Sequence, residues 1–172
     1  MNRLFILFVL SALLLIGFWA CEPKAPEAPE APENDYVDLG LSVKWATMNI
    51  GANSTEAYGD LYYYDEALSE FGDNLPTQAQ FEELIDKCEW NWVKQSGVNG
   101  YKITGPNGNS IFLPAAGVRL INGEVGLVGT DGSYWSSTPY ESGGAIGLCF
   151  FNGNYYIAKF TTSGLSVRLV RK

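Results

Sequence analysis

The chain has 172 residues, with eleven basic and nineteen acidic side chains, no histidine, and a formal net charge of −8 at pH 7. Because no basic stripe is available to displace counterions, nucleic acid is not an expected partner. The lack of histidine removes the most common general base, the Ser-His and Cys-His nucleophile pairs, and most catalytic zinc sites. We therefore expect no catalytic residue, no metal and no cofactor.

Residues 1–20 have the layout of a secretory signal peptide. Arg3 precedes an apolar run over residues 4–19, and the small residue Ala20 closes this run directly before Cys21. A cysteine at the cleavage point is typical of bacterial lipoproteins, in which the thiol carries diacylglycerol. We therefore expect lipid attachment at Cys21 and a membrane as a partner. An ordinary signal peptide or a single membrane anchor is the alternative, although the run is shorter than the ~20 residues of a spanning helix.

Residues 21–35 contain the lipidated cysteine and a proline-rich tether. Residues 23–33 read PKAPEAPEAPE and hold four of the eight prolines of the chain. Proline at every third position favours extended polyproline II, which rises ~3.1 Å per residue and would lift a domain ~30 Å from a lipid surface. Low-complexity disorder without a spacing role is the alternative. With Arg3 removed, the mature chain carries ten basic and nineteen acidic residues, a net charge of −9.

Residues 36–172 are predicted to form one domain. This part holds eighteen of the nineteen glycines, all ten tyrosines and four of the five tryptophans. It is long enough to bury a core. Its first predicted strands are Leu41–Thr47 and Leu61–Tyr64.

One amphipathic helix is predicted over residues 77–88. Thr77 is a suitable N-cap, and Gln80, three residues later, completes a capping box. Beyond the helix, Trp90 and Trp92 are interpreted as residues that close the core, with a ligand platform as the alternative. The apolar stripe of the helix has i, i+3, i+4, i+7 spacing and comprises Phe81, Leu84, Ile85 and Cys88.

After this helix the sequence predicts short strands separated by turns. Asn107-Gly108 supplies a hairpin turn between strands 101–104 and 110–113, and Asn122-Gly123 and Asp131-Gly132 predict two more turns. The fold class is therefore α+β, a loop-rich antiparallel β-sheet with one clear helix. The remaining predicted strands are Tyr134–Ser137, Ala145–Phe151, Tyr155–Phe160 and Ser166–Val170, with turns at 152–154 and 161–164.

Several residues of chemically interesting types are interpreted as structural. Cys88 and Cys149 could form one disulfide in an exported protein, or remain small buried thiols. Ser136-Ser137-Thr138 has no accompanying base. The basic residues near the end, Arg168, Arg171 and Lys172, are too few to indicate a phosphate site.

Six segments of the domain occur in the order typical of one family of exported proteins. These segments are DLGLSVKWATMNIGA, YGDLYYYDEA, LPTQAQFEELIDKCEW, GYKITGPNGNSIFLPAAGVR, GSYWSST and GLSVRLVRK. On them the chain resembles the Fibrobacter succinogenes major paralogous domain, which is common in Bacteroidetes and their relatives. The resemblance covers residues 36–171 and implies a compact fold similar to C-type lectins and to the formylglycine-generating enzyme. It also implies that Val43–Ala46 lies beside Val167–Val170.

The first function class is a binding module. The tether and the resemblance favour an outer-membrane lipoprotein at the cell surface, with a lectin-like domain for adhesion to a glycan or protein ligand. The domain has no Glu-Pro-Asn, Gln-Pro-Asp or Trp-Asn-Asp triplet, so calcium-dependent sugar binding is not expected. Tyrosine and asparagine at loop tips offer stacking area and hydrogen bonds. The candidate contact residues are Tyr140, Glu141, Asn152, Asn154, Tyr155 and Tyr156, although Tyr155 and Tyr156 must point to opposite faces of their strand.

Two other classes remain. A structural or accessory component of a cell-envelope assembly would be distinguished by a contiguous exposed apolar patch. An enzyme, by analogy with the formylglycine-generating enzyme, would need a paired-cysteine copper site, and Cys88 and Cys149 lack the expected motif. We therefore do not expect an enzyme.

Overall fold

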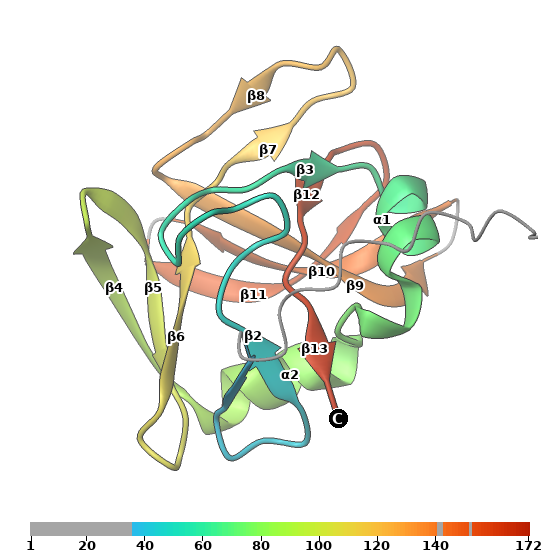
Figure 1. The fold of residues 1–172 in the computed structure, drawn as a ribbon. Coiled ribbons are helices and arrows are strands. Elements are labelled where there is room, and N and C mark those ends of the chain that lie inside the picture. Colours follow the sequence, from blue (N-terminus) through green and yellow to red (C-terminus); the bar gives the residue numbers. More distant parts are fainter. Residues whose placement is uncertain (1–35, 141–142, 152) are drawn as a thin grey trace, which may run out of the picture.

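A computed structural model describes residues 36–140, 143–151 and 153–172. The signal peptide, Cys21 and the tether lie outside the described residues, as do Glu141 and Asn152. The described residues form four β-sheets, two α-helices and one short 3-10 helix (Figure 1). The elements in chain order are β1 (Tyr36–Asp38), β2 (Lys44–Ala46), β3 (Leu61–Tyr62), α1 (Tyr64–Phe71), η1 (Gly72–Asn74), α2 (Gln78–Lys87), β4 (Glu89–Gln95), β5 (Val98–Thr104), β6 (Ser110–Pro114), β7 (Val118–Arg119), β8 (Val125–Gly126), β9 (Asp131–Tyr140), β10 (Gly144–Phe151), β11 (Asn154–Phe160), β12 (Leu165–Ser166) and β13 (Val170–Arg171).

The sheets are almost entirely antiparallel. The largest has the strand order β11-β10-β9-β12-β3, and only its β12–β9 contact is parallel. Two three-stranded sheets, β1-β2-β13 and β4-β5-β6, lie beside it, and β7-β8 forms a separate hairpin. This arrangement confirms the predicted α+β class with a loop-rich, mainly antiparallel sheet.

Helix α2 agrees with its prediction. The Thr77 side chain accepts from the Gln80 N–H at 3.3 Å, and the Gln80 side chain accepts from the Thr77 N–H at 2.7 Å, which is the predicted capping box. The Thr138 hydroxyl accepts from the Gln78 N–H at 2.9 Å, so a residue of the Ser-Ser-Thr run has a structural role. Phe81 and Leu84 are fully buried in the main core.

The last strand of the domain pairs with β2, near the start of the domain, as the resemblance implied for Val43–Ala46 and Val167–Val170. β2 and β13 are antiparallel, with Val170 opposite Trp45, and the Ala46 N–H donates to the Leu169 carbonyl at 2.9 Å. The predicted single strand Ser166–Val170 is wrong in one respect. It is divided into β12 and β13, which join different sheets, so the chain passes from one sheet to another between them.

Helix α1 was not predicted. The strand expected over Leu61–Tyr64 ends at Tyr62, and Tyr63 is the N-cap of α1. Three aromatic residues in succession favour a strand, but the Glu66 carboxylate accepts from the Tyr63 N–H at 2.8 Å and fixes a helix start. Ala67 and Phe71, four residues apart, then bury one face of the helix.

The turn predicted at Asp131-Gly132 is also wrong, because β9 begins there. Gly132 lies opposite Phe150 of β10, and a side chain at this position would collide with the Phe150 ring. The glycine therefore makes room for an aromatic neighbour across the sheet instead of supplying a turn.

Two hydrophobic clusters form the core, and Arg168 lies between elements of both. Trp45, Phe81 and Phe150 belong to the first cluster, and Trp135 to the second. Arg168 is fully buried, and its guanidinium donates to Asn49 Oδ1 at 3.0 Å and to the backbone carbonyls of Ala46 and Phe112 at 2.9 Å each. This residue joins the β2 region to β6.

Cys88 and Cys149 are free, so the two thiols do not form the disulfide that the sequence left open. Burial, and then the nearby charge of Glu83, raises the pKa of the Cys88 thiol to about 11. The thiolate fraction at pH 8 is therefore far below that of an ordinary cysteine.

We expect Cys88 to resist alkylation by iodoacetamide at pH 8 in the folded protein and to react at the normal rate in urea. Mass spectrometry of tryptic peptides would measure this. Since the folded state holds the proton more tightly, Cys88 should also make the free energy of unfolding fall as the pH rises from about 9 to about 11. Equal alkylation of Cys88 in folded and unfolded protein would contradict the prediction.

Candidate functional site

The most exposed apolar surface of the described chain is the β7–β8 hairpin, residues 118–128, which we call the apolar hairpin. Figure 1 shows it projecting from one end of the molecule, away from the C-terminus. Ile121, at its tip, is 77% exposed. Such a group of aliphatic side chains in water is a candidate interaction surface. The exposed aliphatic residues of the hairpin are Leu120, Ile121, Val125, Leu127 and Val128.

Turn chemistry and backbone contacts fix the hairpin. Asn122-Gly123 lies in the turn, as predicted, and the Leu120 N–H donates to the Glu124 carbonyl at 2.8 Å. At the base, Gly117 has a φ of +75° and lies so close to Gly126 that a side chain would meet the Gly126 carbonyl. The hairpin is thus held at its base, and its tip extends into solvent.

A pocket of about 590 Å³ lies between the apolar hairpin and the body of the domain. β3, α1 and the loop before β3 form one wall, and the hairpin forms the other. Its volume is in the range of small-ligand sites. The polar and aromatic lining residues are Tyr58, Asp60, Tyr62, Glu66, Glu70 and Arg119, and the apolar ones are Leu61, Ala116, Val125 and Val128, with Gly59 between Tyr58 and Asp60.

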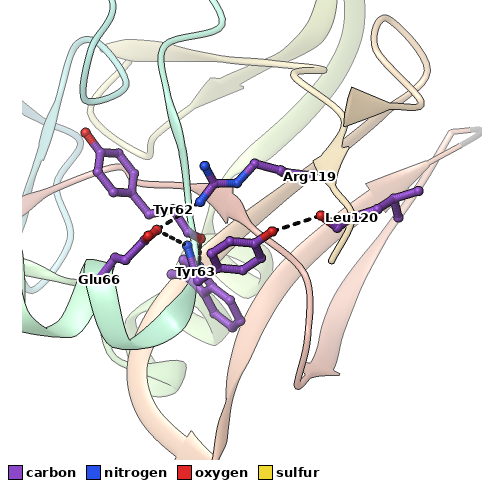
Figure 2. A network of polar contacts seen from close by, with 6 residues as sticks. Tyr62, Tyr63, Glu66, Arg119 and Leu120 are labelled. Atoms are coloured by element: carbon purple, nitrogen blue, oxygen red, sulfur yellow. Dashed lines mark hydrogen bonds and ion pairs between the residues drawn. The ribbon is translucent and has the colours of Figure 1, made fainter. Parts of the chain in front are cut away.

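Arg119 connects the hairpin to the other wall (Figure 2). Its Nη2 atom lies 2.9 Å from the Glu66 carboxylate, and its guanidinium lies 4.2 Å from the centre of the Tyr63 ring. The Tyr63 hydroxyl in turn donates to the Leu120 carbonyl at 2.9 Å. The Arg119 backbone also exchanges two hydrogen bonds with Gly164, at 2.9 and 2.7 Å. These contacts place the hairpin over α1.

The pocket carries excess negative charge. Three carboxylates and one guanidinium line it, and Arg119 is already paired with Glu66. Asp60 and Glu70 make no side-chain hydrogen bond or ion pair with any described residue. Burial, and then the charges of Asp60, Glu70 and Glu66, raises the pKa of the Tyr62 phenol. The negative charges of the pocket therefore act on the same aromatic residue.

The residues predicted as ligand contacts do not gather at this pocket. Tyr140 ends β9, where its ring lies 4.2 Å from the Lys159 amine. Asn154 and Tyr156 lie toward the opposite end of the same sheet, where they are paired with Phe151 and Cys149 of β10. β10 has eight residues, so at ~3.3 Å per residue its ends are ~23 Å apart. Glu141 and Asn152 are outside the described residues.

Tyr155 and Tyr156 point to opposite faces, as predicted. Tyr155 packs against the main core, with its ring 4.4 Å from that of Trp90, whereas Tyr156 is 45% exposed. Trp90 is partly buried in the same cluster, which confirms core closure for this residue. Trp92 contacts Tyr101 and Phe150 but remains 39% exposed.

A second hollow, of about 720 Å³, lies beside β13 and η1. Its lining includes Leu68, Asp73, Thr77, Arg171 and Lys172. Among the described residues that line this hollow, only Leu68 is a large apolar residue with an exposed side chain. The second hollow therefore lacks the apolar patch that accompanies the first pocket.

The described side chains include no group of three or more cysteine, aspartate or glutamate residues placed to share a metal ion. Neither α-helix in the described part of the chain has the length and apolar composition of a membrane span.

Sequence reasoning missed the apolar hairpin, although a signal was present. The segment from Leu120 to Val128 has the Asn122-Gly123 turn flanked by aliphatic residues, and only the turn was predicted. In such a short hairpin, aliphatic residues on both faces cannot all reach a core. Comparison with protein-family models, with curated proteins and with solved structures found no match.

Proposed function

We propose that this chain is an outer-membrane lipoprotein, displayed at the cell surface, whose C-type-lectin-like domain binds a protein ligand through the apolar hairpin. The main support for this proposal is the set of five exposed aliphatic side chains on one hairpin, beside an open pocket. Lipid attachment at Cys21 and the tether of residues 21–35 support the location. The pairing of β2 with β13 is consistent with a lectin-like fold.

The chemistry of the hairpin favours a protein over a glycan. Sugar sites combine aromatic rings with dense hydrogen-bonding groups, whereas Leu120, Ile121 and Leu127 offer only aliphatic surface. Aliphatic surface releases ~25 cal/mol per Å² when a partner covers it. A polypeptide with its own apolar residues is the partner that gains most from this contact.

A permanent subunit contact in a cell-envelope assembly is the second candidate. The exposed apolar patch is the feature that distinguishes this class. Both candidates place a protein on the hairpin. They differ in the lifetime of the complex, which a dissociation rate would measure.

An array of glycans and host-matrix proteins, probed with the full-length chain in detergent with and without calcium, tests the proposal. We expect saturable binding to protein spots, independent of calcium, and a loss of at least about tenfold in affinity with Ile121→Asp. Because the Ile121 side chain is 77% exposed, this change should leave the free energy of unfolding nearly unchanged.

Leu68→Asp is the matched control, since Leu68 is also an exposed aliphatic residue but lies on α1 and lines the other hollow. It should bind like the wild type. Binding confined to glycan spots and insensitive to Ile121→Asp would contradict the proposal and return attention to Tyr140 and Tyr156.

A further inference from the structure

The pocket beneath the apolar hairpin combines features that suit one kind of side chain. Asp60 and Glu70 present carboxylates that no described residue neutralises, and Tyr58 and Tyr62 add aromatic surface. The hairpin wall is aliphatic at Val125 and Val128. A lysine or arginine side chain has an apolar stem and a cationic end, so it can satisfy both walls at once.

Backbone groups at the rim of the pocket are available to an extended segment. Leu120 and Glu124 are hydrogen-bonded across the hairpin, so by alternation Arg119 and Val125 direct their N–H and C=O groups outward. The backbone N–H and C=O of Arg119 are both hydrogen-bonded to Gly164. β8 has only β7 as a neighbour among the described strands, so the outward groups of Val125 lie on an open edge. An open edge can accept an added strand.

These features coincide on one face. Arg119 and Val125 are directly opposed in the register and both line the pocket, so this face of the hairpin lies over the carboxylates, and the open edge of β8 runs along its margin. A free amine would use the charge alone, and a glycan could donate hydroxyl hydrogen bonds to the carboxylates but would leave the aliphatic side chains and the strand edge unused. Only a polypeptide supplies the backbone groups, the apolar side chains and the cation together.

We propose that the ligand is an extended polypeptide segment that lies along β8 and places a lysine or arginine side chain between Asp60 and Glu70, with aliphatic residues on either side. This inference rests on the proposed function and specifies its ligand. The acidic balance of the chain, a formal net charge of −8 at pH 7, agrees with a cationic side chain in the ligand.

The test is an array of acetylated heptapeptides of the form Thr-Val-Thr-X-Thr-Val-Thr, in which X is lysine, arginine, methionine, glutamine or glutamate. The probe is the full-length chain in detergent. We expect the lysine and arginine peptides to bind about tenfold more tightly than the methionine peptide at low salt. This preference should shrink as the ionic strength rises, because ions screen the partly exposed pair.

Variants of the two carboxylates separate charge recognition from apolar contact. Glu70→Gln and Asp60→Asn should each reduce the lysine-to-methionine ratio to about two- or threefold and leave the methionine peptide unaffected. Asp86→Asn, an equivalent change at an exposed acid of α2, should preserve the full ratio. Ile121→Asp should weaken all the peptides together.

Equal binding of the lysine and methionine peptides, or a preference for glutamate, would overturn the inference while the protein ligand of the proposed function stood. No binding by any peptide would also overturn it. If the wild-type protein bound no peptide and also showed no hairpin-dependent binding on the protein array, the proposed function itself would be overturned. Circular dichroism of each variant would show that the lost binding does not reflect unfolding.

Discussion

Replacement of Arg168 by methionine is expected to lower the free energy of unfolding by about 3 kcal/mol or more. Methionine fills much of the same space, but Asn49 Oδ1 and the Ala46 and Phe112 carbonyls lose the donor that they share. Each buried acceptor left without a partner costs about 1–3 kcal/mol. The variant no longer buries a charge, and the desolvation cost that this removes offsets part of the loss. Burial lowers the pKa of Arg168 to about 10, so the guanidinium is charged at pH 7.

Urea unfolding followed by tryptophan fluorescence would measure the loss. Lys102→Met is the matched control, because Lys102 is an exposed cation on β5. It should change the free energy of unfolding by less than about 0.5 kcal/mol. If Arg168→Met and Lys102→Met had the same stability, the three hydrogen bonds would not contribute as the structure indicates.

Gly117→Ala is expected to destabilise the protein by about 3 kcal/mol and to loosen the apolar hairpin. The φ of +75° disfavours any L side chain by ~1 kcal/mol, and the added methyl group would meet the Gly126 carbonyl and approach the Val128 nitrogen at 2.9 Å. The clash of the added methyl group is relieved only when β7 and β8 separate at their base. Hydrogen exchange of the amides of residues 118–128 should therefore accelerate more than exchange in β9 or β10.

Gly108→Ala is the control for backbone strain alone. Gly108 has a similar φ of +86°, but a side chain there would meet no atom within 4 Å. It should cost only about 1 kcal/mol and leave the hairpin amides unchanged. Equal losses for the two variants would mean that crowding at the base of the hairpin contributes nothing.

The sequence predicted those elements whose signals agree with each other. Around α2, the cap at Thr77, the apolar spacing from Phe81 and the polar opposite face all indicate the same helix, and the helix is present. The 101–113 hairpin is present for the same reason, since Asn107-Gly108 lies between two alternating segments. Conflicting signals were harder to interpret. The aromatic run before α1 favoured a strand, and Asp131-Gly132 has turn composition inside a strand.

The candidate site was less predictable because it depends on contacts between distant segments. Asp60, Glu70 and Arg119 come from three separate regions, and no local pattern indicates that they share a pocket. The role of Arg168 was hidden in the same way, since its partners at Asn49 and Phe112 are 119 and 56 residues away. Local composition identified polar and aromatic loop tips, but the fold distributes them over two ends of one sheet.

The closeness of the two ends of the domain determines how it would carry mechanical load. The guanidinium of Arg171 lies 4.7 Å from the centre of the Tyr36 ring, so the chain enters and leaves at one place. Figure 1 shows the apolar hairpin at the opposite end from the C-terminus. For a domain anchored through Cys21, tension from a ligand on the hairpin would cross the whole core. The path of this load would end at β1, a strand of three residues that pairs only with β2 among the described strands. Under tension β1 would separate first, and the buried Leu39 just beyond it would resist further extension.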